Sequence, residues 1–578
     1  MADPDHYEPS HSAPQSAAPT AQAAQAAPTT HHQAASNPTT PATSTAQEAA
    51  ESAVITPSPA FTNDIPTRTD VAIIGSGPGG YSCALRAAQL GLHVTLIERD
   101  EHAGGTCLNR GCIPTKALLD AAHAAWEARR GESLGFGTRA QQPDRERLLG
   151  FQHNAVRTMV DGLESLIKAR RIAFVHGQSA IDTATTADTA TAVASATEPA
   201  TGSAQPMRTV TVDSADGTRH RISARHVVIA TGATPRPLAE APFGGRVLDS
   251  DAALELPVIP RSVIVIGSGA VGLEFASFWA AMGSSVTVLV RHGRPLSDWP
   301  RRVGASLKRG MTAHGVTFMD YTAVESCTTD DGTVTLTVST RKGTAALCAD
   351  YCLVAIGRTP STDAPWIEKA GVERDSRGFI VTDPWGRTTS SDMASGMASA
   401  MASAMASGIW AVGDVTAGRQ LAHRAFAQGR VVAETMAGLS PAPVRDELVP
   451  RVVFSLPEAA SVGLDADQAK SGAFGTFSDV RETAIPMDGN ARTAIAGDTG
   501  VVDIVTGVDG NAPDSPRLVL GVHMAGPHVS EFIGEAQQIV RNRIPLAEAA
   551  LAIHAHPTFS EALGEALLKA DGSPLHTM

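Results

Sequence analysis

The sequence predicts an α/β protein with two parallel-sheet domains, because one strand–glycine loop–helix–strand pattern occurs twice along its 578 residues. Each copy opens with a short run of β-branched residues and continues with the spacing Gly-x-Gly-x-x-Gly. A chain of this length accommodates three or four domains. Its 43% hydrophobic and 18% charged residues are typical of a globular protein.

The N-terminal segment, residues 1–66, contains mainly Ala, Pro, Thr, Ser and Gln. Such a composition buries too little apolar surface to offset the entropy of ordering, so we expect a disordered tail. Two further low-complexity stretches are expected to be surface-loop insertions, residues 182–208 and a Met-Ala-Ser repeat at 393–408.

The first glycine loop follows a strand expected at residues 70–74 and precedes a helix expected to end near Leu90. A second strand, residues 94–97, then ends at an acid, Glu98. This is the complete dinucleotide-binding pattern, in which the glycines let the backbone approach a pyrophosphate and the acid accepts hydrogen bonds from ribose hydroxyls. The three glycines are Gly75, Gly77 and Gly80.

The second copy has strands expected at residues 263–266 and 286–290, with a helix between them that ends near Met282. Two such patterns in one chain predict two nucleotide cofactors, one in each α/β domain. A duplicated fold with one inactive site is the alternative. The glycines of this copy are Gly267, Gly269 and Gly272.

Two cysteines, Cys107 and Cys112, lie about ten residues after Glu98. A metal site would need cysteine pairs at two-residue gaps and further ligands, and none is nearby. A four-residue gap on a helical turn lets two sulfurs meet as a reducible disulfide. The other four cysteines, expected to be small core residues, are Cys83, Cys327, Cys348 and Cys352.

The run Gly-Gly-Thr-Cys-Leu-Asn-Arg-Gly-Cys-Ile-Pro-Thr-Lys at 104–116 resembles the redox-disulfide signature of the flavin-dependent pyridine nucleotide-disulfide oxidoreductases, most closely the dihydrolipoamide dehydrogenase branch. The resemblance implies two Rossmann-like domains, the first for FAD and the second for NAD(P), and an α+β C-terminal dimerisation domain. It implies Cys112 as the flavin-side thiol and Cys107 as the interchange thiol. Further FAD contacts implied are Thr106, Lys116, Thr231, Gly232 and Asp414, and Gly357 falls at the end of the NAD(P) domain.

The resemblance also implies domain boundaries along the chain. The expected segments are the FAD-binding domain at 67–255, the NAD(P)-binding domain at 256–380, a return to the FAD domain at 381–445 and the dimerisation domain at 446–578.

The C-terminal run His-Ala-His-Pro-Thr-Phe-Ser-Glu at 554–561 resembles the family's acid–base signature. It implies that His556 is the base, that Glu561 orients it, and that the pair serves the disulfide of the other subunit of a homodimer. Lys116 and Glu274 also fall at family positions, where an ion pair beside the flavin ring is implied.

The chain departs from the NAD-dependent pattern at the end of the strand at 286–290, where Val290 replaces the usual acid and Arg291 follows. An arginine there suits the 2′-phosphate of NADP(H), as in the glutathione reductase branch, and Arg294 is a candidate companion. We therefore expect NADP(H), or use of both nucleotides, over strict use of NAD.

The leading functional hypothesis is a homodimeric enzyme that passes electrons between dihydrolipoyl groups, the disulfide, FAD and NAD(P), with the lipoyl domain of a 2-oxoacid dehydrogenase or glycine cleavage complex as a partner. The alternative is an NADPH-dependent reductase of a small-molecule disulfide such as glutathione or mycothiol. Mercuric reductase is disfavoured because no C-terminal cysteine pair is present, and a non-catalytic subunit is disfavoured because both cysteines and His556 are retained.

Composition also bears on partners. A formal net charge of −13 without a basic block argues against nucleic acid or an anionic membrane surface. No apolar run reaches the ~18–20 residues that cross a bilayer, and no signal peptide is visible, so a cytoplasmic location is expected.

Overall fold

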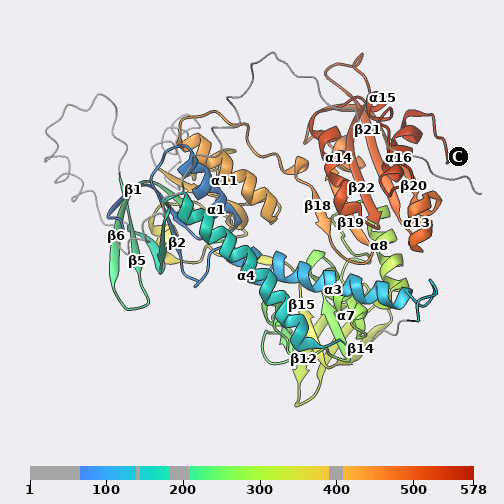
Figure 1. Ribbon diagram of the computed structural model, residues 1–578, viewed down its shortest axis with the longest axis horizontal. Helices are drawn as coiled ribbons and strands as arrows, with labels where there is room; N and C mark the ends of the chain where they lie inside the picture. The colour runs from blue at the N-terminus through green and yellow to red at the C-terminus, as the bar shows by residue number, and fades with distance from the viewer. Residues whose placement is uncertain (1–64, 138–142, 183–206, 390–407, 578) are drawn as a thin grey trace, which may run out of the picture. The chain divides into compact units, whose positions relative to one another are not determined.

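The computed structural model describes residues 65–137, 143–182, 207–389 and 408–577 (Figure 1). These residues form three large sheets and two small ones, one of three strands and one of two. The tail at 1–66 lies outside these residues apart from its last two positions. The two expected insertions also lie outside them, apart from their end residues. Within the described ranges no helix is long and apolar enough to cross a membrane.

The first sheet has the order β3-β2-β1-β6-β5-β4, with β17 also paired to β6. Strands β1, β2, β3, β6 and β17 run parallel, so their carboxyl ends meet at one edge. The strands are β1 (Arg68–Ile74), β2 (Val94–Glu98), β3 (Ala173–His176), β4 (Gln178–Asp182), β5 (Arg208–Asp213), β6 (Arg219–Ile229) and β17 (Ile409–Ala411).

Helices α1 and α11 pack against each other beside this sheet, and α3 and α4 follow the second strand. Helix α3 also packs on α7 of the next sheet, where Leu118 and Leu119 share one apolar core with Leu273 and Phe275. The helices are α1 (Pro78–Gln89), α2 (Gly105–Arg110), α3 (Cys112–Arg130), α4 (Arg145–Ala169) and α11 (Ala422–Met436).

The second sheet is entirely parallel, with the order β11-β10-β9-β15-β8. Its strands are β8 (Val247–Leu248), β9 (Ser262–Ile266), β10 (Ser285–Val290), β11 (Val316–Asp320) and β15 (Tyr351–Val354). Its helices are α6 (Ser250–Leu254), α7 (Ala270–Ala281) and α8 (Arg301–Ala313).

Between β11 and β15 the chain forms an antiparallel meander, β12 (Ala323–Thr329), β13 (Val334–Thr340) and β14 (Gly343–Ala349). A short pair, β7 (Ala233–Pro235) and β16 (Arg358–Pro360), and helix α9 (Pro365–Lys369) complete this region.

The third sheet is antiparallel, with the order β18-β19-β22-β21-β20. Helices α14 (Val529–Arg541) and α16 (Glu561–Asp571) pack beside it and share its apolar core (Figure 1). The strands are β18 (Arg451–Val453), β19 (Glu458–Gly463), β20 (Phe477–Pro486), β21 (Val501–Asp509) and β22 (Leu518–Gly526), and the short helices are α12 (Ala466–Lys470), α13 (Ala491–Ala496) and α15 (Leu546–Ala549).

One expectation about the cysteines is wrong. Cys83 and Cys352 are fully buried and Cys327 is half-buried, but Cys348 is exposed. Strand β14 is an edge strand, and its alternate residues face solvent, so Cys348 points outward while Ala349 is buried.

Candidate active site

The loop after β1 requires glycine for steric reasons. Gly75 has a φ of +102°, and a Cβ there would overlap the carbonyl oxygen of Ala230. A Cβ on Gly80 would overlap the carbonyl of Gly75, and Gly77 is the extended N-cap of α1. The helix N-terminus is therefore held close to the strand, with its amides free to bind an anion.

The acid at the end of β2 organises this loop. The Glu98 carboxylate accepts hydrogen bonds from the Ser76 amide at 2.7 Å and the Ser76 hydroxyl at 2.6 Å, and from the amides of Arg99 and Asp100. Glu98 is buried and also lines the cavity described next. A ribose hydroxyl could take the place of the rotatable Ser76 hydroxyl.

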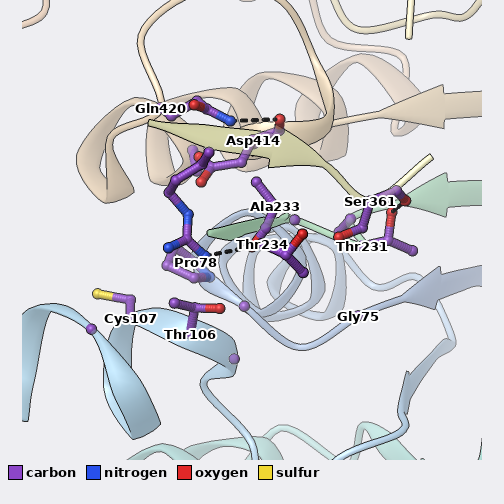
Figure 2. Close-up of a pocket in the computed structure, with 18 of the residues that line it drawn as sticks. Gly75, Pro78, Thr106, Cys107, Thr231, Ala233, Thr234, Ser361, Asp414 and Gln420 are labelled. Carbon is purple, nitrogen blue, oxygen red and sulfur yellow. Dashed lines mark hydrogen bonds between the residues drawn. The ribbon is translucent and has the colours of Figure 1, made fainter. Parts of the chain in front are cut away.

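A cavity of about 620 Å³ opens beside the glycine loop. Figure 2 shows Asp414 and Gln420 on one side of it and Thr106 and Cys107 on the other. Burial raises the pKa of the Asp414 carboxyl, which has no hydrogen-bond donor among the described residues. A bound polyol would supply that donor. The lining includes Gly75, Gly77, Glu98, Thr106, Cys107, Cys112, Lys116, Thr231, Gly232, Glu274 and Asp414.

Cys107 and Cys112 both line this cavity and are free thiols in the structure. Cys107 lies on α2, Gly111 breaks the helix, and Cys112 is the first residue of α3. A hydrogen bond from the Cys107 thiol lowers the pKa of Cys112, and the charge of Lys116 lowers it further, whereas the same bond raises the pKa of Cys107. Burial opposes this lowering of the pKa of Cys112, whereas the position of Cys112 at a helix N-terminus favours its thiolate form.

Lys116 and Glu274 form an ion pair between α3 and α7, with 2.7 Å between Nζ and Oε2. The Glu274 side chain is only 6% exposed, and its second oxygen accepts from the Phe454 amide at 3.0 Å. The Lys116 ammonium also lies 4.6 Å from the centre of the Phe454 ring. These contacts fix a cation beside Cys112 at the cavity wall.

Replacement of this cation tests its effect on the thiol. We expect Lys116→Met to raise the pKa of Cys112, because the thiolate loses a stabilising charge, while Lys116→Arg retains the low value. The measurement is the pH dependence of Cys112 carbamidomethylation in the reduced protein, resolved by peptide mass spectrometry. An unchanged profile in Lys116→Met would contradict the electrostatic role.

The second glycine loop repeats the geometry of the first. Gly267 has a φ of +112°, and a Cβ there would overlap the carbonyl of Ala355, while a Cβ on Gly272 would overlap the carbonyl of Gly267. Gly269 is the extended N-cap of α7, and Gly357 has a φ of +121° close to the same strand ends. The backbone of this loop is therefore also shaped for close approach of a nucleotide.

Arg291 follows β10 directly, after the buried Val290. Its side chain is exposed, and no residue of the described ranges bonds to it. Arg294, which the sequence suggested as its companion, instead donates to the carbonyls of Ser297 at 2.7 Å and Trp299 at 3.0 Å. The turn after β10 thus presents Arg291 to solvent and uses Arg294 to fix its own shape.

His556 pairs with Glu561, the first residue of α16, with 2.8 Å between Nδ1 and Oε1. Partial burial by itself raises the pKa of Glu561, but hydrogen bonds from the Thr558 amide and from His556 outweigh it and hold this pKa below its usual range. The His556 side chain is 74% exposed and does not line the cavity that contains the cysteines. One chain therefore does not bring His556 to the thiols.

Two aromatic residues near the thiols carry no sequence motif and were missed. Phe454 contacts both members of the Lys116–Glu274 pair. Burial raises the pKa of Tyr81, and the nearby sulfurs of Cys107 and Cys112 raise it further. Only the three-dimensional arrangement reveals them, because Tyr81 lies on α1 and Phe454 follows β18.

Two family models match the chain. Residues 69–429 match the pyridine nucleotide-disulphide oxidoreductase family, and residues 449–567 match the dimerisation domain of the same family.

Known proteins resemble it over most of its length. It is 32% identical over 514 residues to a dihydrolipoyl dehydrogenase of Geobacillus stearothermophilus, covering 89% of this chain and 98% of that protein. It is 35% identical over 508 residues to dihydrolipoyl dehydrogenase 3 of Pseudomonas aeruginosa, covering 87% of this chain and 98% of that protein.

Two solved structures share the fold. LpdA from Mycobacterium tuberculosis superposes with a TM-score of 0.72 at 24% identity, covering 87% of this chain and 99% of that one. RclA from Escherichia coli, an HOCl-induced flavoprotein disulfide reductase solved as a Cu(II) complex, superposes with a TM-score of 0.69 at 25% identity. The match covers 86% of this chain and 99% of that one.

Proposed function

This chain belongs to the pyridine nucleotide-disulphide oxidoreductase family, as its sequence predicted, and from that premise we propose that it oxidises dihydrolipoyl groups through the Cys107–Cys112 pair. Family membership implies that FAD and a nicotinamide nucleotide bind. The observation that carries the proposal is that both thiols and the Lys116–Glu274 pair line the same cavity as the first glycine loop.

The residues of that cavity fit FAD. The Gly75–Gly80 loop and the N-terminus of α1 would hold the pyrophosphate, Glu98 the adenosine ribose, and Asp414 the ribityl hydroxyls. A bound FAD would supply the two-electron chemistry that links the dithiol to the nicotinamide.

The chemistry of the protein itself is thiol–disulfide exchange. One substrate thiolate attacks the Cys107 sulfur of the oxidised pair, which forms a mixed disulfide and releases Cys112 as a thiolate. The second substrate sulfur then attacks the first substrate sulfur in the mixed disulfide, which closes the lipoyl disulfide and releases Cys107, and the proton of the second thiol passes to the Cys107 sulfur. His556 accepts a proton from the substrate, and Lys116 together with the Cys107 thiol stabilises the Cys112 thiolate.

A homodimer would supply the base. The dimerisation domain matches at residues 449–567, and exposed apolar side chains, Leu551 and Ile553, lie immediately before His556. Because His556 does not reach the thiols of its own chain, we assign it to the thiols of the partner subunit. Glu561 then keeps the imidazole oriented and stabilises its protonated form.

Lipoyl domains of a 2-oxoacid dehydrogenase or glycine cleavage complex are the proposed partners, supported by the dihydrolipoyl dehydrogenases among the relatives. Reduction of a small disulfide is the second candidate, favoured by Arg291 alone. Steady-state kcat/KM values with dihydrolipoamide, glutathione disulfide and mycothiol disulfide separate the two. A higher value for either small disulfide with NADPH would reject the leading proposal.

For the nicotinamide nucleotide we propose a preference for NADP(H). Val290 contributes no negative charge at the strand end, and the Arg291 guanidinium is exposed and unpaired within the described ranges. A 2′-phosphate would receive charge-assisted hydrogen bonds there, each worth ~1.5–3 kcal/mol.

The coenzyme ratio tests this preference. We expect kcat/KM to favour NADP(H) over NAD(H) by about tenfold or more, since ~1.4 kcal/mol corresponds to a factor of ten. The double change Val290→Glu with Arg291→Met should invert the ratio, because it restores an acid for the 2′-hydroxyl. A tenfold preference of the unmodified enzyme for NAD(H) would overturn the assignment of Arg291.

A further inference from the structure

Arg291 and Tyr321 occupy equivalent positions at the carboxyl ends of neighbouring strands. Strands β10 and β11 are paired in register up to Val290 and Asp320, and the Thr322 amide donates to the Val290 carbonyl at 3.2 Å. The next residue of each strand leaves the sheet on the same edge. In parallel α/β sheets this edge is where nucleotides bind.

Tyr321 is held between two other segments. A Cβ on Gly293, in the turn after β10, would overlap the Tyr321 ring, so this turn and the ring are in close contact. The guanidinium carbon of Arg341 lies 3.3 Å from the centre of the same ring. Arg341 comes from the β13–β14 turn, which the meander thereby brings to the end of β10.

Arg341 resembles Arg291 in its surroundings. Both side chains are exposed, and within the described ranges neither has a hydrogen bond or an ion pair. The nearby acid, Asp320, is bonded to Lys308 at 2.5 Å. The edge therefore presents two guanidinium groups whose hydrogen-bond donors are free, one of them stacked on an aromatic ring.

We propose that Arg341, positioned by Tyr321, completes with Arg291 a site for the 2′-phosphate of NADP(H). This inference rests on the proposed preference for NADP(H) and adds a specificity residue from a different part of the chain. A planar guanidinium fork matches phosphate oxygens, and stacking on Tyr321 restricts its rotamers before the ligand binds. With Arg291 and Arg341 both available to one phosphate, Arg294 is not needed there and can donate to backbone carbonyls instead.

Binding of nucleotide fragments to the FAD-loaded homodimer tests the site without turnover. The probes are adenosine 2′,5′-bisphosphate and 5′-AMP, measured by titration calorimetry. We expect Arg341→Met to weaken the bisphosphate about tenfold or more and to leave 5′-AMP within about twofold. Tyr321→Phe, which keeps the stacking ring, should bind as the unmodified protein does. Tyr321→Asn should weaken the bisphosphate, since Asn tolerates the left-handed φ of +53° but provides no ring.

Arg309→Met is the matched control. Arg309 is an exposed arginine near the end of α8, a helix that runs away from the carboxyl edge of the strands, so its removal changes net charge equally without touching the site. It should leave both affinities unchanged.

The outcomes separate this inference from the coenzyme proposal. If the bisphosphate binds more tightly than 5′-AMP, and Arg291→Met abolishes this difference but Arg341→Met does not, the inference is wrong and the NADP(H) preference stands. If the unmodified protein binds both probes equally, both the inference about Arg341 and the proposed preference for NADP(H) are wrong. An equal loss in Arg309→Met would show that bulk charge, not Arg341, is responsible.

Discussion

Cys107→Ser and Cys112→Ser are each expected to lower turnover with dihydrolipoamide by about 10³-fold or more, because removal of a nucleophile from a covalent relay leaves only background rate. The two variants should differ in colour when reduced. Cys107→Ser retains a thiolate next to the flavin and its long-wavelength absorbance, whereas Cys112→Ser loses it. The measurement combines steady-state rates with visible spectra of the reduced enzymes.

Cys348→Ser is the control for this pair. It removes an exposed thiol on β14 that bonds only weakly, at 3.5 Å to the Thr335 hydroxyl, and should keep full activity. Normal turnover in either Cys107→Ser or Cys112→Ser would show that the electrons travel by another route.

His556→Gln is expected to lower turnover by about 10²–10⁴-fold while FAD stays bound, because the proton of the dithiol loses its acceptor. Glu561→Ala should lower turnover less, since it acts by orienting His556. His576→Gln is a matched control, because His576 is equally exposed and also faces an acid, Glu565, at 3.4 Å. It should be indistinguishable from the unmodified enzyme.

Mixed dimers test whether the base comes from the partner. When inactive Cys107→Ser and inactive His556→Gln proteins exchange subunits, one of the two sites in each hybrid has both intact thiols and an intact base. Partial activity should therefore return. If exchange is demonstrated by differently tagged subunits and activity stays absent, His556 serves the thiols of its own chain.

Local sequence patterns predicted the fold class and the two glycine loops. The loops were predictable because steric constraints on the backbone require glycine at fixed positions. The positions of the first strand, of its glycine loop and of the helix ending at Leu90 agree with β1 and α1 to within two residues. Gly75 and Gly267 have nearly the same φ and face equivalent carbonyls, which is why one spacing identifies both loops. A motif that reflects a local backbone constraint can be recognised without knowledge of the rest of the chain.

Contacts between distant segments were not predictable in the same way. The contacts of Phe454 with Lys116 and Glu274 join three separate parts of the chain. The hydrogen bonds from Arg294 to two backbone carbonyls were not predicted, because its sequence distance from Arg291 does not reveal them. Arg341 was missed because only the meander brings it to β10.

Anaerobic titration of the oxidised, FAD-loaded enzyme with dihydrolipoamide tests the central claim most directly. After each addition, free thiols are alkylated and identified by peptide mass spectrometry. The account predicts that one equivalent per subunit converts Cys107 and Cys112 together from unlabelled to labelled, with no change at the other four cysteines. Failure of dihydrolipoamide to reduce this pair, or a rise in labelling at another cysteine that precedes labelling of the pair, would contradict it.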